Sequence, residues 1–509
     1  MSEQVAITQN NNDVDIICVD LVFGTLKLCL ITCYHPPSYS KIDFDYLISM
    51  MSITNDLCYS VSQFIIVGDF NLPKIDWLNY ISPNKKCHIL FLTLVNSLGM
   101  HQFVHEPTRE SNILDLVFSN NNALLKSVND WGIALDNNLT TDVVYINFQK
   151  AFDSVSHPKL LAKLALFNIR GNLKNWIAAF LNNRSQQVKV GTSLSNPTCI
   201  ISGVPQGSVL GPTLFLLYIN DITTIVNYLD CSFKLYADDI KLYSSFCNTD
   251  HSHYLAIALN NVVLWSETWQ LPISTSMCFV HRIAPASSRK FVNFNYKLGD
   301  HILAWSSIPK DLGVTLDSQL NYKKHISNIV HAANTRAYLI LKCFKSRDSR
   351  VLVKAFNTYI RPYLEYCSPV WSPYHAELIK VVENVQKGFT KKILHLGNLT
   401  YDNRLHLLDL ESLELRRVKH DLSICYKILH NLVLIDKSMF FLFDNKNNIQ
   451  GHKYKLHKQH CRLDICKFSF SYRVVNIWNQ LPFDVVNDDN INIFKRKINS
   501  INFEKFCRR

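Results

Sequence analysis

The sequence predicts a mixed α/β protein, and three observations support this class. Short runs rich in Ile, Val, Leu and Tyr at residues 16–23 and 27–34 are typical of β-strands. Apolar runs on both sides of Asp238 and Asp239 predict a strand, a tight turn and a second strand. From residue 320 onward the apolar spacing is mostly helical. Strand-rich segments therefore come first, and a helical region follows.

Composition limits the classes of protein to which the chain can belong. Its 509 residues suggest about two to four domains, and 48% hydrophobic with 18% charged residues is typical of globular proteins. No apolar run reaches the roughly 18 residues of a membrane helix, and the N-terminus shows no signal peptide. The fifteen cysteines form no CxxC pair, and the nearest spacings, Cys29 with Cys33 and Cys461 with Cys466, lack ligand partners at zinc-site spacing, so we expect reduced intracellular thiols. A secreted disulfide scaffold, a collagen and a membrane transporter are excluded.

Charge divides the chain into two parts. Residues 1–140 hold 7 basic and 14 acidic residues, whereas the remainder holds 46 basic and 27 acidic residues, a net charge of +19. Such asymmetry indicates two units with different roles. A basic unit of this size fits a nucleic-acid partner, because neutralising phosphates drives such binding. A solvated basic surface on an ordinary protein explains the charge equally well.

Local patterns predict the elements of the first unit. The apolar run 64–67 ends in Gly68 and Asp69, which indicates a buried strand with a carboxylate at its end. Residues 119–142 are Asn-rich, so we predict an irregular boundary there. The other predicted elements are helices at 41–62 and 88–99 and a strand at 113–118.

The second unit begins with a β-rich run at 142–148 and changes to helical spacing near residue 320. Its predicted elements are helices at 158–167 and 171–181, hairpin strands at 187–190 and 198–201, a helix at 208–222, strands at 232–237 and 240–243, and helices at 325–344, 351–366 and 376–396. We therefore divide the chain into residues 1–125, a junction at 126–141, a central domain at 142–320 and a helical region at 321–509.

Three segments carry residues suited to chemistry. The adjacent carboxylates Asp238 and Asp239 in YADD can be aimed at metal ions, as phosphoryl transfer with two metal ions requires, although such a pair in a turn is usually only solvated. The glycines of GVPQGSVLGP at 203–212 allow close approach of a substrate to the backbone, and the following helix start favours anions. The third segment is NFQKAFDSVSH at 147–157.

In their order along the chain, NFQKAFDSVSH, GVPQGSVLGP and YADD resemble the palm of a reverse transcriptase. The resemblance is closest to the palm of LINE-type, non-LTR retrotransposons of the jockey group. The resemblance continues through LFLLYIND at 214–221, WQL at 269–271, LGVTLD at 312–317, YIRPYLEY at 359–366 and WNQLP at 478–482. It covers nearly everything from about residue 142 to 485. It implies a right-hand polymerase palm, with an antiparallel sheet that carries the YADD turn, followed by a helical thumb.

The acidic first part resembles the second half of an endonuclease/exonuclease/phosphatase domain, a DNase I-like α/β sandwich. YHPP at 34–37, GDFNLP at 68–73 and LDLVF at 114–118 match that family in order. In the family the Asp and Asn of GDFN, here Asp69 and Asn71, handle the scissile phosphate and the attacking water. Asp115 belongs to the third segment. The closing Ser-Asp-His of the family does not follow Asp115, so nicking activity is not expected.

The resemblance implies a set of site residues, a cofactor and partners. The expected cofactor is Mg²⁺ in a two-metal site, with Mn²⁺ as an alternative, and the expected partners are template RNA, primer or target DNA and deoxynucleoside triphosphates, with no membrane and no obligate protein partner. The implied residues are Asp238 and Asp239 for the metal, Asn147 at the third ligand position, Phe152, Gln206, Gly207 and Tyr236 for nucleotide or template, and Lys323, Lys324 and Arg336 for the nucleic-acid backbone. Each of the last seven also has a purely structural interpretation, as a core aromatic, a turn residue or a solvated helix face. His281, His301 and His325 show no metal spacing and are expected at the surface.

The chain departs from the family at several positions. Asn147 stands where the family has the third metal-binding Asp, and Met277 aligns with a Lys that protonates the leaving pyrophosphate. The fingers region is absent between the two units, and the endonuclease segment is incomplete. Three interpretations stay open: a working or residual RNA-directed DNA polymerase, a catalytically dead relic that binds nucleic acid, and a reading frame that omits coding sequence for the fingers. Family function implies the nucleus, with the cytoplasm as an alternative.

Overall fold

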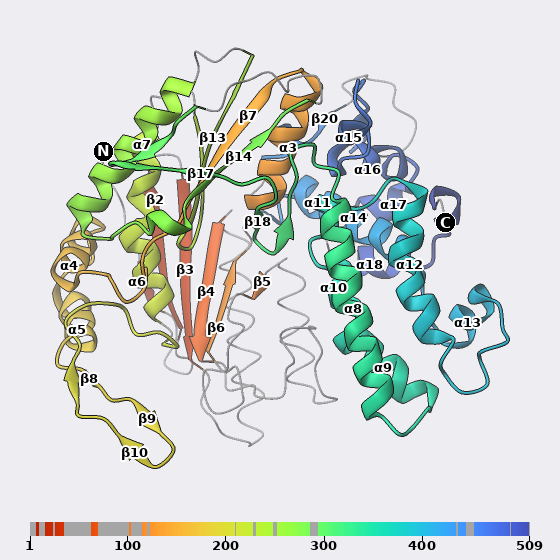
Figure 1. The fold of residues 1–509 in the computed structure, drawn as a ribbon, viewed down its shortest axis with the longest axis horizontal. Coiled ribbons are helices and arrows are strands. Elements are labelled where there is room, and N and C mark those ends of the chain that lie inside the picture. The colour runs from red at the N-terminus through yellow and green to blue at the C-terminus, as the bar shows by residue number, and fades with distance from the viewer. Residues whose placement is uncertain are drawn as a thin grey trace.

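The computed structural model describes six strands within residues 7–119 and then residues 123–507, apart from 209, 227–230, 248–251, 286–293, 434–435, 444–451, 453 and 489. The predicted helices at 41–62 and 88–99, and Asn71, lie outside the described residues. The mixed α/β class is confirmed (Figure 1). None of the helices in these ranges is long and apolar enough to cross a membrane.

The first unit contains a six-stranded sheet with the order β1-β2-β3-β4-β6-β5. Its strands are β1 (Ile7–Gln9), β2 (Ile16–Phe23), β3 (Leu26–Tyr34), β4 (Gln63–Asp69), β5 (His101–Gln102) and β6 (Asp115–Ser119). The pairing is antiparallel except between β3 and β4, which are parallel. A parallel pair needs a long connection, and residues 35–62 separate β3 from β4 in the sequence. The four strands predicted in this unit are confirmed.

The predicted irregular boundary at 119–142 is wrong. Helix α3 (Ala123–Asp136) and the start of strand β7 (Thr140–Ile146) occupy it. Val128, Trp131 and Leu135 recur at helical spacing and are buried, and the Trp131 ring meets the Tyr243 ring edge-on at a centroid distance of 5.7 Å. Most of the asparagines that suggested a loop flank the helix in the sequence and Asn129 lies within it, so the composition concealed the apolar face.

The central sheet has five strands in the order β12-β13-β7-β14-β17. Its other strands are β12 (Ser232–Tyr236), β13 (Asp239–Phe246), β14 (Phe279–Ile283) and β17 (Ala304–Trp305). Alternation along the strands buries both faces. One face packs Val144 and Leu242 with side chains of α6 (Leu210–Ile219) and α7 (Ser252–Trp269), whereas Val143 and Tyr243 join the core that contains α3. The predicted strand-turn-strand at 232–243 is confirmed.

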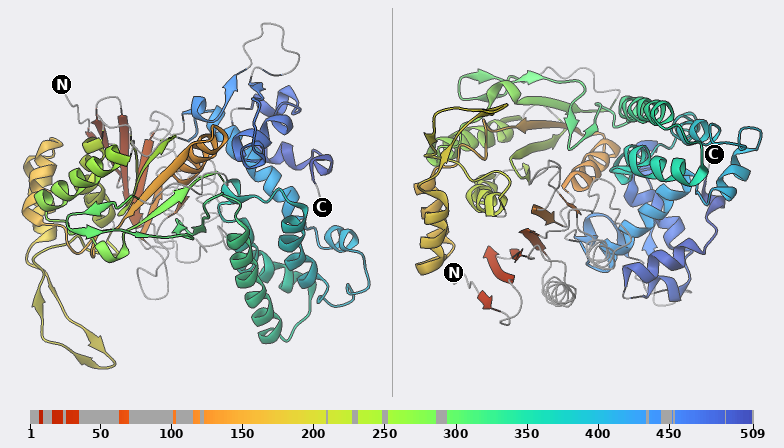
Figure 2. Two further views of the ribbon diagram at one scale, coloured as in Figure 1. Left: turned by 45° about the horizontal axis from the view of Figure 1, so that its top comes forward. Right: turned by 90° about the horizontal axis from the view of Figure 1, so that it is seen from below.

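Two helices and a ribbon lie at the end of this sheet away from the C-terminus (Figure 2). Helices α4 (His157–Leu166) and α5 (Gly171–Leu181) match their predicted ranges closely. The predicted hairpin consists of two short ladders, which pair Ser185–Gln186 with Thr198–Cys199 and Lys189–Val190 with Ser193–Leu194. All eight of these residues are exposed.

The C-terminal part is helical, as predicted. Its main helices are α8 (Lys323–Cys343), α9 (Ser349–Tyr359), α10 (Arg361–Glu365), α11 (Ser368–Trp371), α12 (Ala376–Thr390), α14 (Leu413–Leu429), α16 (Phe470–Trp478) and α18 (Ile491–Asn499). The helix predicted over 351–366 is divided at Ile360, because Pro362 cannot continue the backbone hydrogen bonds of α9. The prediction that His281 and His325 lie at the surface is wrong, because their side chains are only 1% and 2% exposed. Burial lowers the pKa of His325 to about 4. His301 is exposed, as expected.

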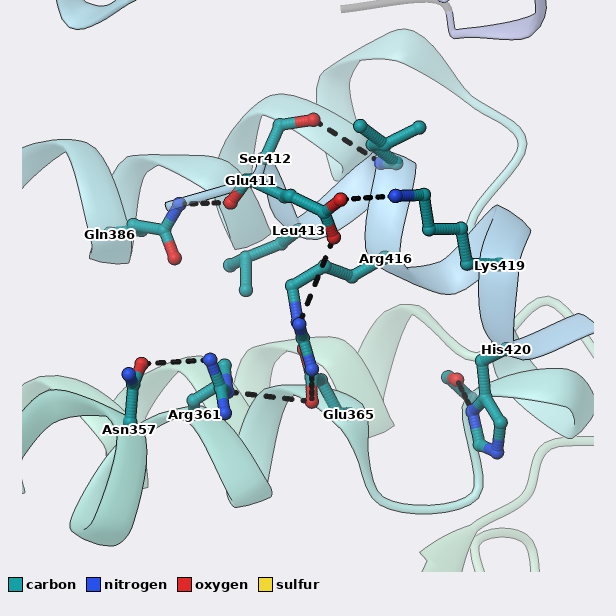
Figure 3. A network of polar contacts seen from close by, with 12 residues as sticks. Asn357, Arg361, Glu365, Gln386, Glu411, Ser412, Leu413, Arg416, Lys419 and His420 are labelled. Carbon is teal, nitrogen blue, oxygen red and sulfur yellow. Dashed lines mark hydrogen bonds and ion pairs between the residues drawn. The ribbon is translucent and has the colours of Figure 1, made fainter. Parts of the chain in front are cut away.

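A polar network joins α10 to α14 inside this helical part (Figure 3). Glu365 accepts two hydrogen bonds from Arg416, one of them at 3.1 Å, and its second oxygen lies 3.7 Å from Arg361. Glu411 lies between Arg416 and Lys419. A bidentate pair of this kind fixes orientation as well as distance. The network therefore orients α10 against α14.

We predict that Trp131→Ala destabilises the chain far more than Trp176→Ala. Trp131 is fully buried between α3 and the central sheet, so its removal should cost about 3–5 kcal/mol. Trp176 is 55% exposed, so its removal should change the free energy of unfolding by about 0.5 kcal/mol or less. Urea unfolding of the two variants measures the difference. Equal destabilisation would contradict the helical packing of α3.

Candidate active site

The YADD segment forms a two-residue hairpin turn between β12 and β13. Tyr236 pairs with Asp239, which leaves Ala237 and Asp238 as the turn. Ala237 has a φ of 51°, the left-handed conformation that tight hairpin turns require. Asp238 is half-buried and Asp239 is exposed, so the turn presents two adjacent carboxylates at the end of the central hairpin.

Asn147 lies directly beside this turn. Strand β7 pairs with β13 so that Ile146 faces Ile240, which brings the next residue, Asn147, level with Asp239. The Asn147 Nδ2 donates a hydrogen bond to Asp239 Oδ1 at 3.4 Å. Two backbone contacts fix its position: Ser274 N donates to Asn147 O at 2.8 Å, and Asn147 N donates to Cys278 Sγ at 3.4 Å. The structure thus brings together three residues that are up to 92 positions apart.

The electrostatics of the two carboxylates favour a positive charge beside them. Burial raises the pKa of Asp238 and of Asp239, and the neighbouring charges of Asp238 and Asp311 raise the pKa of Asp239 further. Lys241 acts in the opposite direction on Asp239. Carboxylate oxygens are the ligands that Mg²⁺ and Mn²⁺ prefer, so Asp238 and Asp239 fit one divalent cation. The neutral Asn147 turns its N–H toward Asp239. These three residues therefore provide two carboxylates, one fewer than the three that the family's two-metal site contains.

The loop after β7 is locked to the glycine-rich segment. Val204 N donates to Phe152 O at 2.8 Å, and Gln206 Nε2 donates to Asp153 Oδ1 at 2.8 Å. Gly203 has a φ of 90°, and a Cβ there would lie 2.8 Å from the Asp153 backbone. Only glycine fits this close approach. The carboxylate of Asp153 is therefore engaged with Gln206.

The implied nucleotide and template residues border this locked loop. The Phe152 ring stacks on Phe215 of α6 at a centroid distance of 4.4 Å and is half-buried. Gln206 and Gly207 are exposed in the turn that precedes α6, and Tyr236 is half-buried beside the carboxylates. Of these four positions, Tyr236 lies on the hairpin that carries Asp238 and Asp239, whereas Phe152, Gln206 and Gly207 lie on the loop after β7 and in the glycine-rich turn.

A buried ion pair near the turn was missed by sequence reasoning. Lys241 Nζ lies 2.8 Å from Asp311 Oδ2, and both side chains are 3% exposed or less. Tyr145 of β7 donates a hydrogen bond to the same carboxylate at 3.0 Å. Lys241 lies two positions after Asp239, so strand alternation could have placed it on the same face of the sheet. Its partner follows 70 positions later, and no local pattern indicates it.

The segment aligned with the family's fourth motif lies next to Asn147. Phe148 forms an isolated β-bridge with Ile273, and a single 3-10 turn (Thr275–Met277) follows. Met277 is 63% exposed. A thioether cannot deliver a proton, so this position lacks the acid that a lysine would supply.

The other implied residues lie elsewhere. Asp69 ends β4 and Asp115 begins β6, and the two are direct partners in the sheet. Lys323 and Lys324 are exposed at the start of α8. Arg336 is half-buried, and its guanidinium stacks on the Tyr363 ring at 3.8 Å. The structure therefore places the implied residues in three separate parts: two neighbouring strand ends in the first unit, the YADD turn and a basic helix.

Comparison with known proteins agrees with this arrangement. Residues 115–315 match the family described as reverse transcriptase (RNA-dependent DNA polymerase), and residues 28–142 match the family described as endonuclease-reverse transcriptase. The RNA-directed DNA polymerase from mobile element jockey of Drosophila melanogaster is 29% identical over 266 residues, which cover 49% of this chain and 28% of the relative. The probable RNA-directed DNA polymerase from transposon BS of the same species is 30% identical over 252 residues, which cover 47% and 26%.

Among solved structures, apo telomerase from Candida tropicalis matches 59% of this chain and 54% of that chain, with 12% identity and a TM-score of 0.34, which is too low to define the fold. The fold and the motif matches make the central domain a reverse transcriptase domain. More narrowly, the family matches and the curated relatives support a relationship to non-LTR retrotransposon reverse transcriptases that carry an N-terminal endonuclease-like domain. The family predicted from the motif order is confirmed. The chain spans about a quarter of the length of the two curated relatives.

We predict that Gly203→Ala is more harmful than Gly207→Ala. Both glycines have positive φ, which costs other residues about 1–2 kcal/mol. At Gly203 the new methyl group also meets the Asp153 backbone, which should add about 1–3 kcal/mol, whereas at Gly207 nothing lies within 4 Å. Chemical denaturation of both variants tests this difference. Equal free energies of unfolding would show that the loop is not locked at Gly203.

Proposed function

We propose that this chain is an RNA-directed DNA polymerase whose nucleotidyl transfer is limited by Asn147. The observation that carries the proposal is the meeting of Asp238, Asp239 and Asn147 at the hairpin turn, with Asn147 3.4 Å from Asp239. Two carboxylates on a tight turn beside a strand end provide the charge that phosphoryl transfer needs. The proposed partners are template RNA, primer or target DNA and deoxynucleoside triphosphates, and the proposed location is the nucleus, where target DNA lies.

In the proposed reaction, a primer 3′-hydroxyl attacks the α-phosphorus of a deoxynucleoside triphosphate. A new oxygen–phosphorus bond forms, the bond to pyrophosphate breaks, and the hydroxyl proton leaves to solvent. Mg²⁺, or Mn²⁺ in its place, would supply Lewis-acid stabilisation of the phosphate charge when held by Asp238 and Asp239. Phe152 and Gln206, held in the locked loop, would position the nucleotide against this pair. Gly207 and Tyr236 border the same space.

Asn147 limits this chemistry in two ways. It removes one negative charge from the site, which weakens the attraction for a second cation. Its Nδ2 also donates to Asp239 Oδ1, so it competes with a cation for that oxygen. The exposed Met277 adds a second deficit, because it cannot protonate the leaving pyrophosphate. The proposal is therefore a polymerase with low activity and an intact palm framework.

Nucleic-acid binding without catalysis is the second candidate. The net charge of +19 after residue 140 favours it, as do the exposed Lys323 and Lys324 at the start of α8. Binding of this kind depends on releasing counterions from phosphates. Its strength is independent of Asn147.

We predict that Asn147→Asp increases Mg²⁺-dependent primer extension on an RNA template by about 100-fold or more, because a metal ligand contributes several kcal/mol to the transition state. The substitution should also place two carboxylates side by side. Mg²⁺ should therefore raise the melting temperature of Asn147→Asp more than that of the unmodified chain. Gel assays of extension and thermal melts with and without Mg²⁺ provide the two readouts.

The matched controls for this prediction are Asp239→Ala and the double variant Asn147→Asp with Asp239→Ala. Both should show no extension, because the carboxylate nearest to Asn147 is removed. Extension that persists in Asp239→Ala would come from a contaminating polymerase and would contradict the assigned site. If Asn147→Asp binds Mg²⁺ but does not extend, the candidate that only binds nucleic acid is favoured.

We predict salt-sensitive RNA binding that weakens when Lys323 and Lys324 are both replaced by Ala. If each lysine neutralises one phosphate, the slope of log K against log salt should fall by about 1.4–1.8 in magnitude. Lys380 and Lys458 are also exposed and lie outside α8, so their double alanine variant is the control. Fluorescence anisotropy at several salt concentrations measures the slopes. Identical slopes for the two variants would remove α8 from the interface.

A further inference from the structure

The C-terminal end of α3 is fastened to a segment that lies more than 300 positions later. Asp136, the last residue of α3, accepts hydrogen bonds at its Oδ1 from Arg462 N at 2.9 Å and Leu463 N at 2.6 Å. Arg462 Nε donates to the backbone oxygen of Asp136 at 3.0 Å. These bonds hold α3 beside the short helix α15 (Asp464–Lys467), as Figure 1 also shows.

Two thiols lie at this same junction. The Sγ atoms of Cys461 and Cys466 and a carboxylate oxygen of Asp136 all lie within 4.8 Å of one another. Within the described ranges, no other group of three or more His, Cys, Asp or Glu side chains is close enough to hold a metal ion. Cys466 is 1% exposed, whereas Cys461 and Asp136 are half-buried, so the group opens to solvent on one side.

We propose that Asp136, Cys461 and Cys466 form a zinc site with a fourth position open to solvent. Zn²⁺ binds thiolates at about 2.3 Å and carboxylate oxygens at about 2.0–2.2 Å, so ligands of one ion lie about 3.5–4 Å apart. Small side-chain rotations bring the three atoms from their present spacing to that distance. Thiolates select Zn²⁺ over Mg²⁺, which separates this site chemically from Asp238 and Asp239.

The surroundings support a metal in two further ways. The two backbone N–H groups orient the Asp136 carboxylate, as the outer shell of metal sites commonly does. The phenol of Tyr472 contacts both thiols, and the positive side chain of Arg462 lies at the same junction.

A zinc ion here would connect two parts of the chain that are far apart in the sequence. Helix α3 leads into β7, the strand that directly precedes Asn147, whereas α15 belongs to the C-terminal helical part. A metal bonded to both would tie the central sheet to the C-terminal helices. The inference does not rest on polymerase activity, because its ligands lie away from the YADD turn.

The test is a titration of the reduced, metal-free full chain with Co²⁺, whose bonds to thiolates give an absorption band in the near ultraviolet. We expect one equivalent to produce the band, Zn²⁺ to displace it, and either Cys461→Ser or Cys466→Ser to abolish it. Cys343→Ser is the control, since Cys343 is an exposed cysteine on α8. Zn²⁺ should also raise the melting temperature of the control and of the unmodified chain, but not of Cys466→Ser.

Three results would overturn the proposal: no thiolate band, a band that persists when both cysteines are replaced, or a disulfide. The last would appear as a loss of two titratable thiols that a reductant restores without metal. Cys461 is half-buried, so Cys461→Ser is the variant that should fold if Cys466→Ser does not. Circular dichroism of each variant verifies folding before the titration is read.

Discussion

The pairing of β7 with β13 is the constraint on which the rest of the structure depends. Seven residue pairs, from Ile146 opposite Ile240 to Thr140 opposite Phe246, set residue 147 beside residue 239. A slip of one residue would turn every side chain to the other face of the sheet. Val144 and Val143 are both fully buried, on opposite faces, so neither face tolerates that change. Burial on both sides therefore fixes the geometry of the candidate active site.

The ion pair of Lys241 with Asp311 connects strand β13 to the segment around residue 311. A buried pair gains little net stability, but leaving one partner alone is costly. Asp311 raises the pKa of Asp239 and Lys241 lowers it, so the intact pair has opposing effects on the site. Tyr145, on the strand that directly precedes Asn147, donates to Asp311 as well. The segment that carries Asp311 is thus attached to the central sheet, and the ion pair adds no net charge beside Asp239.

Prediction from sequence succeeded where the signal was local and failed where partners were distant. Helix α5 at Gly171–Leu181 was predicted to the residue, because its apolar spacing is a local signal. Motif order located Asp238 and Asn147, since family patterns already contain the long-range contact. Lys241 with Asp311 had no such pattern. Cys461 and Cys466 were set aside for want of a third ligand, and that ligand, Asp136, comes from a helix that its Asn-rich surroundings concealed.

The contacts that order the loop around residue 147 are independent of its side chain, so the site stays ordered with Asn147 in place of an aspartate. Backbone bonds from Ser274, pairing of β7 with β13 and the contact between Gly203 and Asp153 hold the loop, and none of them involves the side chain of residue 147. An amide there bonds to Asp239, whereas a carboxylate would need a cation to offset repulsion between like charges. Without metal, Asn147 is therefore the less strained residue. Fold stability and catalytic charge respond in opposite directions at this position, so loss of the charge leaves the palm framework unaltered.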